Sequence, residues 1–186
     1  MTLVEAVLWR RLDEPAFEHS RVMALPQGFV LEGRVLMVVD RAPAEAHYSV
    51  HCGPDWITRH AHVEVIQGLT TRRLHVRRDE RERWWADDRP IPGVDGVQDV
   101  DLAFTPCTNT LPIRRMTLAI GESRPSDAVW VRFPELTCER LLQRYTRVDG
   151  LLYRYESNGG GFAADIHVDD HGVVTRYGDL WERVAR

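Results

Sequence analysis

The stretch FAADIHV, residues 162–168, alternates in the way that a half-buried β-strand requires. Successive side chains of a strand point to opposite faces of the sheet, so every second residue shares one environment. One face would carry Phe162, Ala164, Ile166 and Val168, and the other Ala163, Asp165 and His167. Asp165, His167 and the following Asp169 could hold a divalent metal. Because the opposite face is apolar, a solvent-exposed polar face is the favoured interpretation.

The same period of two recurs along the chain. It is found in HVEVI (62–66), RLHV (73–76) and AVWVRF (128–133), and the longer FVLEGRVLMVVD (29–40) contains Gly33, which suggests a bulge or a sharp bend. Turn signals separate these runs at short intervals, among them LPQG, CGPD, IQGL, VDGL, SNGGG and DDHG. Many short strands with frequent turns indicate an antiparallel all-β protein.

The C-terminal segments predict a meander. LLQRYTRV (141–148), LLYRYES (151–157), FAADIHV and VVTRY (173–177) follow one another with only short turns between them. A wide sheet of this kind twists and curves. We therefore expect a mainly all-β fold, with a strongly curved antiparallel sheet or incomplete β-barrel and few short helices, in which residues 1–186 form a single domain.

Composition limits the function classes. The net charge of −4 does not favour a nucleic-acid partner, and the basic run RRLHVRRDERER (72–83) is interleaved with acids, as on a solvated strand edge. No stretch approaches the roughly 20 apolar residues of a membrane span. The N-terminus lacks the features of a signal peptide, and three widely spaced cysteines suggest reduced thiols, so we expect a cytoplasmic protein. The sequence does not indicate an oligomeric state.

Several motifs have weak chemical interpretations. The glycines of SNGGG join two strands with no helix after them, so we expect a hairpin loop and not a phosphate site. Cys107 could be a nucleophile, but nothing around it resembles an activating motif, and buried free cysteines are common. The histidines His47, His51, His60 and His62 could converge on a metal from neighbouring strands, but no established ligand motif supports this. We expect neither a metal nor a cofactor.

The most unusual stretch is FTPCTNTLPIRRM, residues 104–116. Pro106 and Pro112 prevent regular strand pairing, and the three polar residues between them can satisfy the freed backbone groups with their side chains. If the segment is extended, one of Arg114 and Arg115 must point inward. An inward arginine needs an acidic partner, and Asp99 or Asp101 is available just upstream. The segment is then either a hydrogen-bonded corner of the fold or the polar mouth of an apolar cavity.

These residues also carry a family resemblance. DVDLAFTPCTNTLPIRRM (99–116) resembles the signature of a bacterial family named for glycolipid binding, earlier a domain of unknown function. The resemblance extends through WVRFPEL, YRYES and FAADIHVDDHGVVTRYGDLWERV, and more loosely VLEGRV, over nearly the whole chain. It implies a strongly curved antiparallel sheet similar to the carriers that move lipoproteins between bacterial membranes. Those carriers work outside the cytoplasm, so a cytoplasmic relative needs another cargo or none.

The sequence departs at two places from the family pattern that the resemblance implies. Cys107 stands where an aromatic residue is expected, which argues against a shared nucleophile there. Trp84 and Trp85 stand around a position that the family fills with one tryptophan, so one of the pair could face a cavity and the other solvent.

From the motif and the resemblance together we expect non-enzymatic binding of an amphipathic small molecule, glycolipid-like, in an apolar cavity with a polar rim. The expected ligand-binding residues are Asp101, Thr108, Asn109, Thr110, Arg114, Arg115 and Tyr145. Two alternatives stay open: an enzyme that uses Asp, Arg or His groups at the same mouth, and a protein-interaction module without a ligand. A filled interior would argue against the first hypothesis, and an unperturbed set of acids would argue against the second.

Overall fold

A computed structural model describes all residues from Met1 to Arg186. The first half of the chain forms eight strands: β1 (Thr2–Arg11), β2 (Ala16–Leu25), β3 (Gly28–Val39), β4 (Ala42–Cys52), β5 (Thr58–Gln67), β6 (Thr70–Arg78), β7 (Trp84–Ala86) and β8 (Arg89–Pro90). The middle forms β9 (Asp99–Leu102), the 3-10 helix η1 (Cys107–Asn109), α1 (Thr110–Met116), β10 (Ser123–Pro125), β11 (Ala128–Val131) and β12 (Cys138–Leu141). The last part forms β13 (Gln143–Arg147), β14 (Leu152–Ser157), the 3-10 helix η2 (Asn158–Gly160), β15 (Phe162–Val168), β16 (Val174–Tyr177) and β17 (Trp181–Ala185).

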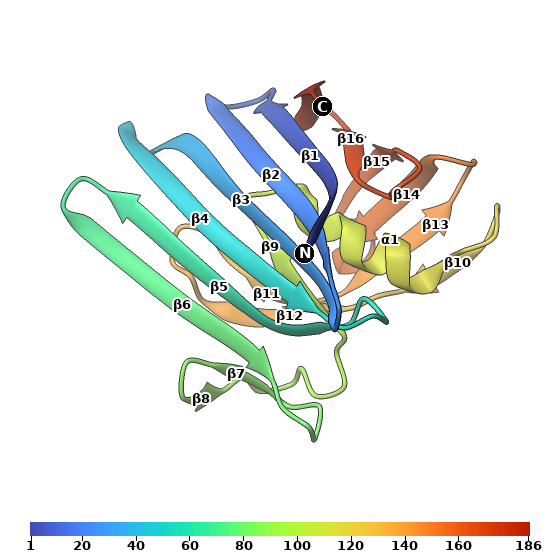
Figure 1. Cartoon of the computed structure of the whole chain (residues 1–186), viewed down its shortest axis with the longest axis horizontal. Coiled ribbons are helices and arrows are strands. Elements are labelled where there is room, and N and C mark those ends of the chain that lie inside the picture. The colour runs from blue at the N-terminus through green and yellow to red at the C-terminus, as the bar shows by residue number, and fades with distance from the viewer.

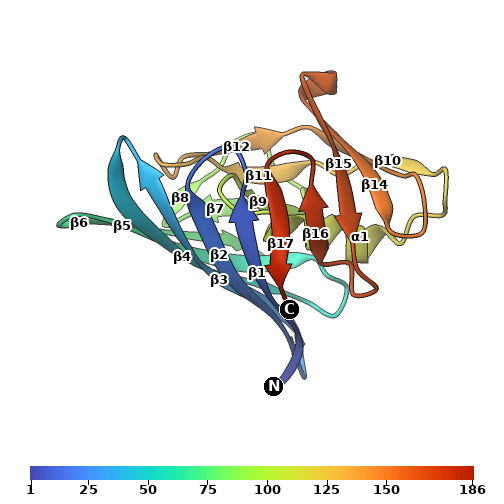
Figure 2. The same cartoon turned by 90° about the horizontal axis from the view of Figure 1, so that it is seen from above.

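One large antiparallel sheet dominates the fold. Its 14 strands follow the order β10-β13-β14-β15-β16-β17-β1-β2-β3-β4-β5-β6-β7-β8, and its two end strands are not paired with each other. The first and last long strands, β1 and β17, are neighbours, so the sheet continues from the end of the chain to its beginning. Figures 1 and 2 show that the sheet curves strongly. The expectation of a mainly β, strongly curved antiparallel sheet with few short helices is confirmed.

A second sheet of three strands, in the order β12-β11-β9, occupies the inside of the curve together with η1 and α1 (Figure 1). Its apolar side chains belong to the same cluster of 39 buried residues as those of the large sheet, with Val100 and Val129 from the small sheet and Val50 and Val63 from the large one. The inside of the curve is therefore packed with side chains over most of its area, and any ligand space must lie near its margins.

Residues 162–168, whose alternation predicted a strand, form β15. In β15, Ala164, Ile166 and Val168 are buried and Asp165 and His167 are exposed. Asp169 departs from the expected exposed face. It lies in the turn after the strand and accepts hydrogen bonds from the backbone nitrogens of His171 and Val173, and its other oxygen binds Arg183 at 2.6 Å.

Two local predictions differ in part from the structure. Residues 141–148 do not form one strand, because β12 ends at Leu141 in the small sheet and β13 begins at Gln143 in the large one. There is also no bulge at Gly33, which pairs in regular register with Ser20 on β2 and Tyr48 on β4. A Cβ atom at Gly33 would lie 2.6 Å from Cε1 and Oη of Tyr48, so glycine is needed there to let the tyrosine ring cross β3.

No helix of the protein has the length and apolar composition that a membrane-spanning helix requires.

Candidate functional site

The motif of residues 104–116 is helical from Cys107 to Met116, so the condition of an extended segment, on which the argument for an inward arginine depended, is not met. After Pro106 the chain forms η1 and continues directly into α1. Pro112 is the third residue of α1, within the first turn, where backbone N–H groups have no partner inside the helix. Thr108, Asn109 and Thr110 are buried, so this part of the motif does not form an open rim.

Arg115 binds Asp99 at the start of β9. Nε donates to Oδ1 at 3.2 Å and Nη2 to Oδ2 at 2.5 Å, and the hydroxyl of Ser126 also donates to Oδ2, at 2.9 Å. The side chain of Asp99 is only 1% exposed. An inward arginine with an acidic partner was expected for an extended segment; the segment is helical, but Arg115 does have an acidic partner, and of the two acids available it is Asp99.

Asn109 and Tyr145 form a second buried connection. The hydroxyl of Tyr145, on β13, donates to Oδ1 of Asn109 at 2.8 Å, and Nδ2 of Asn109 donates to the carbonyl of Pro106 at 3.0 Å. The hydroxyl oxygen of Thr108 accepts a long hydrogen bond from the backbone nitrogen of Leu102 at 3.4 Å. The Thr110 hydroxyl is buried without a hydrogen-bond partner. These contacts join the segment around α1 to both sheets. This part of the motif is therefore a hydrogen-bonded corner of the fold.

Arg114 points elsewhere. Its guanidinium lies over the ring of Trp56, 5.2 Å from the centroid, and it forms no salt bridge. It lines a hollow of about 500 Å³ that also includes Tyr153 and Asp170, on another side of α1 from Asp99. The motif therefore does not gather the two arginines at one mouth.

A pocket of about 300 Å³ lies between the two sheets where β14, β15 and β16 face β9 and β11. The strands of the large sheet that line it, β14 to β16, lie close to the β10 end of that sheet. Nine of its 15 lining residues are hydrophobic. The lining consists of Trp130, Tyr155, Phe162, Tyr177 and Trp181 among the aromatics, Leu102, Ala103, Leu141 and Leu180 among the aliphatics, and Arg11, Asp101, Thr105, Asn109, Ser157 and Asn158 among the polar residues.

Three of the aromatic rings, those of Tyr155, Phe162 and Tyr177, pack against one another edge to face. The ring centroids of Tyr155 and Tyr177 are 5.9 Å apart at 88°, and those of Phe162 and Tyr177 are 6.2 Å apart at 89°. Such edge-to-face contacts hold the rings in place and leave their other faces available. Phe162 is 38% exposed although it is apolar and belongs to the strand that predicts the fold. It therefore forms part of the rim of this pocket.

Asp101 is the carboxylate of the pocket. It accepts one hydrogen bond, from Nε2 of Gln143 at 2.5 Å, and the same amide contacts the Tyr155 hydroxyl at 2.9 Å. Burial raises the pKa of Asp101 to about 6, and the negative charge of Asp99 adds to the increase. Most of the acceptor capacity of this carboxylate is unused, since an ionised carboxylate has about four lone-pair sites.

A buried polar network lies behind the pocket. Thr105, which lines the pocket, donates to Oε1 of Glu18 at 2.7 Å, and Tyr48 donates to the same oxygen at 2.5 Å. Burial raises the pKa of Glu18 to about 8, so this carboxyl is protonated at neutral pH. Cys107 contacts Ser20 in the same network, and burial raises the pKa of its thiol to about 12. A protonated, fully buried thiol is a poor nucleophile, which argues against a catalytic Cys107.

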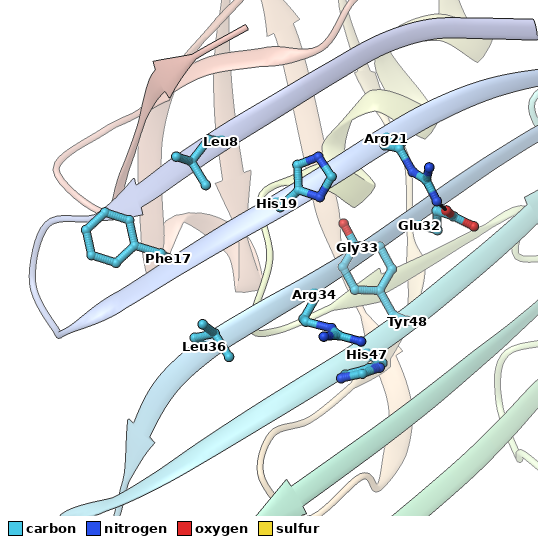
Figure 3. Close-up of a pocket in the computed structure, with 10 residues that line it drawn as sticks. All are labelled: Leu8, Phe17, His19, Arg21, Glu32, Gly33, Arg34, Leu36, His47 and Tyr48. Carbon is cyan, nitrogen blue, oxygen red and sulfur yellow. Dashed lines mark hydrogen bonds and ion pairs between the residues drawn. The ribbon is translucent and has the colours of Figure 1, made fainter.

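Another depression, of about 500 Å³, lies on the outer face of β1 to β4 (Figure 3). Phe17 and Leu36 line one end and His19, Arg34 and His47 lie further along it (Figure 3). At the far end the charges of Arg21 and Glu32 are already paired with each other. It is more polar than the pocket between the sheets and offers no unpaired carboxylate.

Comparison with protein families places the chain in one of them. The model of the family described as "Putative glycolipid-binding" matches residues 6–183. The chain belongs to this family. A crystal structure of a DUF1089 family protein from Pseudomonas aeruginosa is similar to it, with 31% sequence identity, a TM-score of 0.81 and 95% of each chain covered. No curated protein matches the chain.

The ligand-binding residues predicted from the sequence do not all lie at one site in the structure. Of those residues, Asp101 and Asn109 line the pocket between the sheets, and Arg114 lines another hollow. Thr108, Thr110, Arg115 and Tyr145 line neither of the two. The sequence analysis missed the aromatic lining. Neither tryptophan of the Trp84–Trp85 pair lines this pocket, because Trp84 is fully buried with its indole bonded to the Val97 carbonyl, and Trp85 packs against arginines.

Proposed function

We propose that this member of the glycolipid-binding family binds an amphipathic small molecule by its sugar headgroup in the pocket between the two sheets. The observation that carries the proposal is the lining itself: five aromatic side chains surround a carboxylate with free acceptor capacity. Small-molecule sites are typically apolar with a few placed polar groups, and this lining has that composition. The family description supports the same class of ligand.

The chemistry of a sugar fits both parts of the lining. A pyranose has apolar C–H faces, which pack on aromatic rings, and a rim of hydroxyl groups, which need hydrogen-bond partners. Trp130, Phe162 and Trp181 supply rings. Asp101 supplies acceptor sites for the hydroxyls, and ionised acceptors form the stronger hydrogen bonds.

The size of the pocket favours a headgroup over a whole lipid. A volume of about 300 Å³ is at the lower end of the usual range for ligand pockets, which is roughly 300–1,000 Å³. The acyl chains would then extend past the rim. Two exposed apolar residues, Leu12 and Leu142, lie next to the lining of the pocket. The backbone nitrogen of Leu12 donates a hydrogen bond to the carbonyl of Leu180, and the carbonyl of Leu142 accepts one from the backbone nitrogen of Asn158.

Native mass spectrometry of freshly purified protein, followed by extraction and identification of bound molecules, tests the proposal. We expect an adduct whose released component contains a sugar and an apolar chain. A Trp130→Ala variant should lose the adduct, and Leu36→Ala, at an exposed apolar position on the outer face of β3, should keep it. An adduct equally abundant in both variants would overturn the assignment to this pocket.

One observation favours a second function, acid–base catalysis on the same ligand. The pKa of Asp101, raised to about 6, is in the range of a general acid at neutral pH. Glycoside hydrolysis usually requires two carboxyl groups, and the neighbouring Asp99 is bound to Arg115. Turnover of 4-nitrophenyl glycosides that disappears in Asp101→Asn would support catalysis. Saturable binding without turnover would support a carrier or receptor.

A further inference from the structure

Four histidines lie together on the outer face of β4, β5 and β6. The antiparallel register pairs His51 with His60 and His62 with His75. His60 and His62 are two residues apart on β5, so they share a face. The sequence analysis considered His51, His60 and His62, but His75 came into the group only through the pairing of β5 with β6. His47 is not one of the four and lies 3.4 Å from Glu45.

The spacing of the imidazole nitrogens suits a metal ion. One nitrogen from each of His60, His62 and His75 lies within 4.8 Å of the corresponding nitrogens of the other two. In a tetrahedral zinc site with Zn–N bonds of about 2.0–2.1 Å, ligand nitrogens are about 3.4 Å apart. The three groups therefore need to approach by roughly 1.4 Å at most. Because the torsion that turns an imidazole ring is soft, side-chain rotation supplies this without backbone movement.

Two of the three rings are parallel in the structure. The rings of His62 and His75 are stacked 4.2 Å apart at 3°, and His60 stands nearly perpendicular to both. The lone pair of an imidazole nitrogen lies in the plane of the ring, so two parallel rings must tilt toward each other to share an ion. His60 is already suited to the purpose, because its Nδ1 is buried without a hydrogen-bond partner.

The surroundings favour neutral donors and tolerate a cation. Burial and the neighbouring histidines lower the pKa of His60 to about 4. Burial, followed by the charges of His62 and Arg77, lowers the pKa of His75, and Asp87 opposes this decrease. Arg77, the cross-strand neighbour of His60, is turned onto Trp85, with its guanidinium 4.9 Å from the ring centroid. Asp87 adds a negative charge beside His75, and its Oδ1 accepts a hydrogen bond from the backbone nitrogen of His75 at 3.0 Å.

We propose that His60, His62 and His75 bind one divalent transition-metal ion of the zinc type on the outer face of the sheet. Imidazole nitrogens favour zinc, copper and nickel, and oxygen-preferring ions such as magnesium find no ligands of their kind in the triad. Three histidines leave a fourth position for water or for a ligand atom from outside. His62 is exposed, so this position opens to solvent, in a shallow depression of about 490 Å³ that His62 and His75 line with Asp87. This inference does not depend on the proposed function, since the histidines and the sugar pocket share no residue.

Isothermal titration of Zn²⁺ into protein that carries no polyhistidine tag and has been freed of metal tests the proposal. We expect one saturable equivalent of zinc, and no binding of Mg²⁺. His62→Ala and His75→Ala should each weaken zinc binding by at least about tenfold. His167→Ala is the matched control, because His167 is an exposed histidine on β15 outside the triad, and it should bind zinc as the original protein does.

A second readout separates three-histidine coordination from loose association. Co²⁺ in place of zinc should give the intense visible absorption of a four-coordinate site, and His62→Ala should abolish it. Because His62 is exposed, this variant is expected to fold, and an unchanged circular dichroism spectrum will verify that. The absence of saturable zinc binding would overturn the proposal, as would undiminished binding in the His62→Ala/His75→Ala double variant.

Discussion

Arg115 of α1 holds Asp99 of β9 through two hydrogen bonds inside the curved sheet, with only 1% of the Asp99 side chain exposed. Removing one partner of a buried ion pair leaves the other charge unpaired, which typically costs about 3–5 kcal/mol. We therefore expect Arg115→Met to lower the free energy of unfolding by about that amount. Chemical denaturation monitored by tryptophan fluorescence measures it.

A surface ion pair provides the control. Arg154 and Asp165 lie 3.0 Å apart on β14 and β15 with about half of each side chain exposed. Arg154→Met should change the free energy of unfolding by only about 0–1 kcal/mol. If the two variants lose equal stability, the Arg115–Asp99 pair does not hold α1 in place as described.

Glu18 makes stability depend on pH. Its pKa is raised from 4.5 to about 8 by burial in the folded protein, so between these values the folded state binds a proton that the unfolded state has released. Stability from this group is then fully present below pH 4.5 and decreases as pH rises to about 8, by about 1.4 kcal/mol for each pKa unit in the difference.

Glu18→Gln tests this sign. Glutamine keeps a carbonyl acceptor for Tyr48 and Thr105 but does not titrate. The stability of the variant relative to the original protein should therefore rise as pH increases between about 5 and 8, as measured by urea denaturation across that range. A stability difference that stays constant across this range would mean that Glu18 is ionised in the folded protein.

Gly33→Ala should destabilise the sheet. The added methyl group would lie 2.6 Å from the ring and hydroxyl of Tyr48, and the hydrogen bond to Glu18 restrains that ring. Overpacking of this kind typically costs about 1–3 kcal/mol, which a thermal denaturation series would detect. Gly150→Ala is the control, because no heavy atom lies within 4 Å of the added group there. Equal midpoints for the two variants would contradict the crowding at Gly33.

Ligand binding should also depend on pH through Asp101. Its pKa is raised to about 6, and protonation removes acceptor capacity for ligand hydroxyls. The affinity for a short-chain alkyl glucoside should fall as pH decreases from about 7 to 5. Asp101→Asn should bind more weakly at pH 7 and lose this dependence, as followed by isothermal titration. A pH profile shared by the protein and its variant would assign the effect to another group.

The fold followed from local alternation. The buried positions of β15 and those of β5, such as Val63, could be predicted because a strand with one buried face leaves a period of two in the sequence. α1 could not be predicted in this way. It has seven residues with Pro112 among them, too few for a helical period, and the proline fits only because it falls in the first turn.

The site was less predictable than the fold. The ion pair of Arg115 could be anticipated, because a buried arginine needs an acid and Asp99 was close in sequence. The aromatic lining could not, since Trp130, Phe162 and Tyr177 come from three strands, one of them in the smaller sheet. Their convergence depends on how the two sheets pack, and a local pattern carries no information about that. His75 lies beside His62 for a different reason, the register in which β6 pairs with β5, which the sequence analysis did not assign.

Titration of hexyl β-glucoside, below its micelle concentration, into the protein tests the central claim most directly. The account predicts saturable binding of one equivalent that is stronger than for hexanol or glucose alone, because the ligand must use both the aromatic pocket and its apolar rim. Replacing Trp130 with alanine should abolish it, and replacing the outer-face Leu36 with alanine should leave it unchanged. Binding that is absent, or that survives the loss of Trp130 unchanged, would contradict the account.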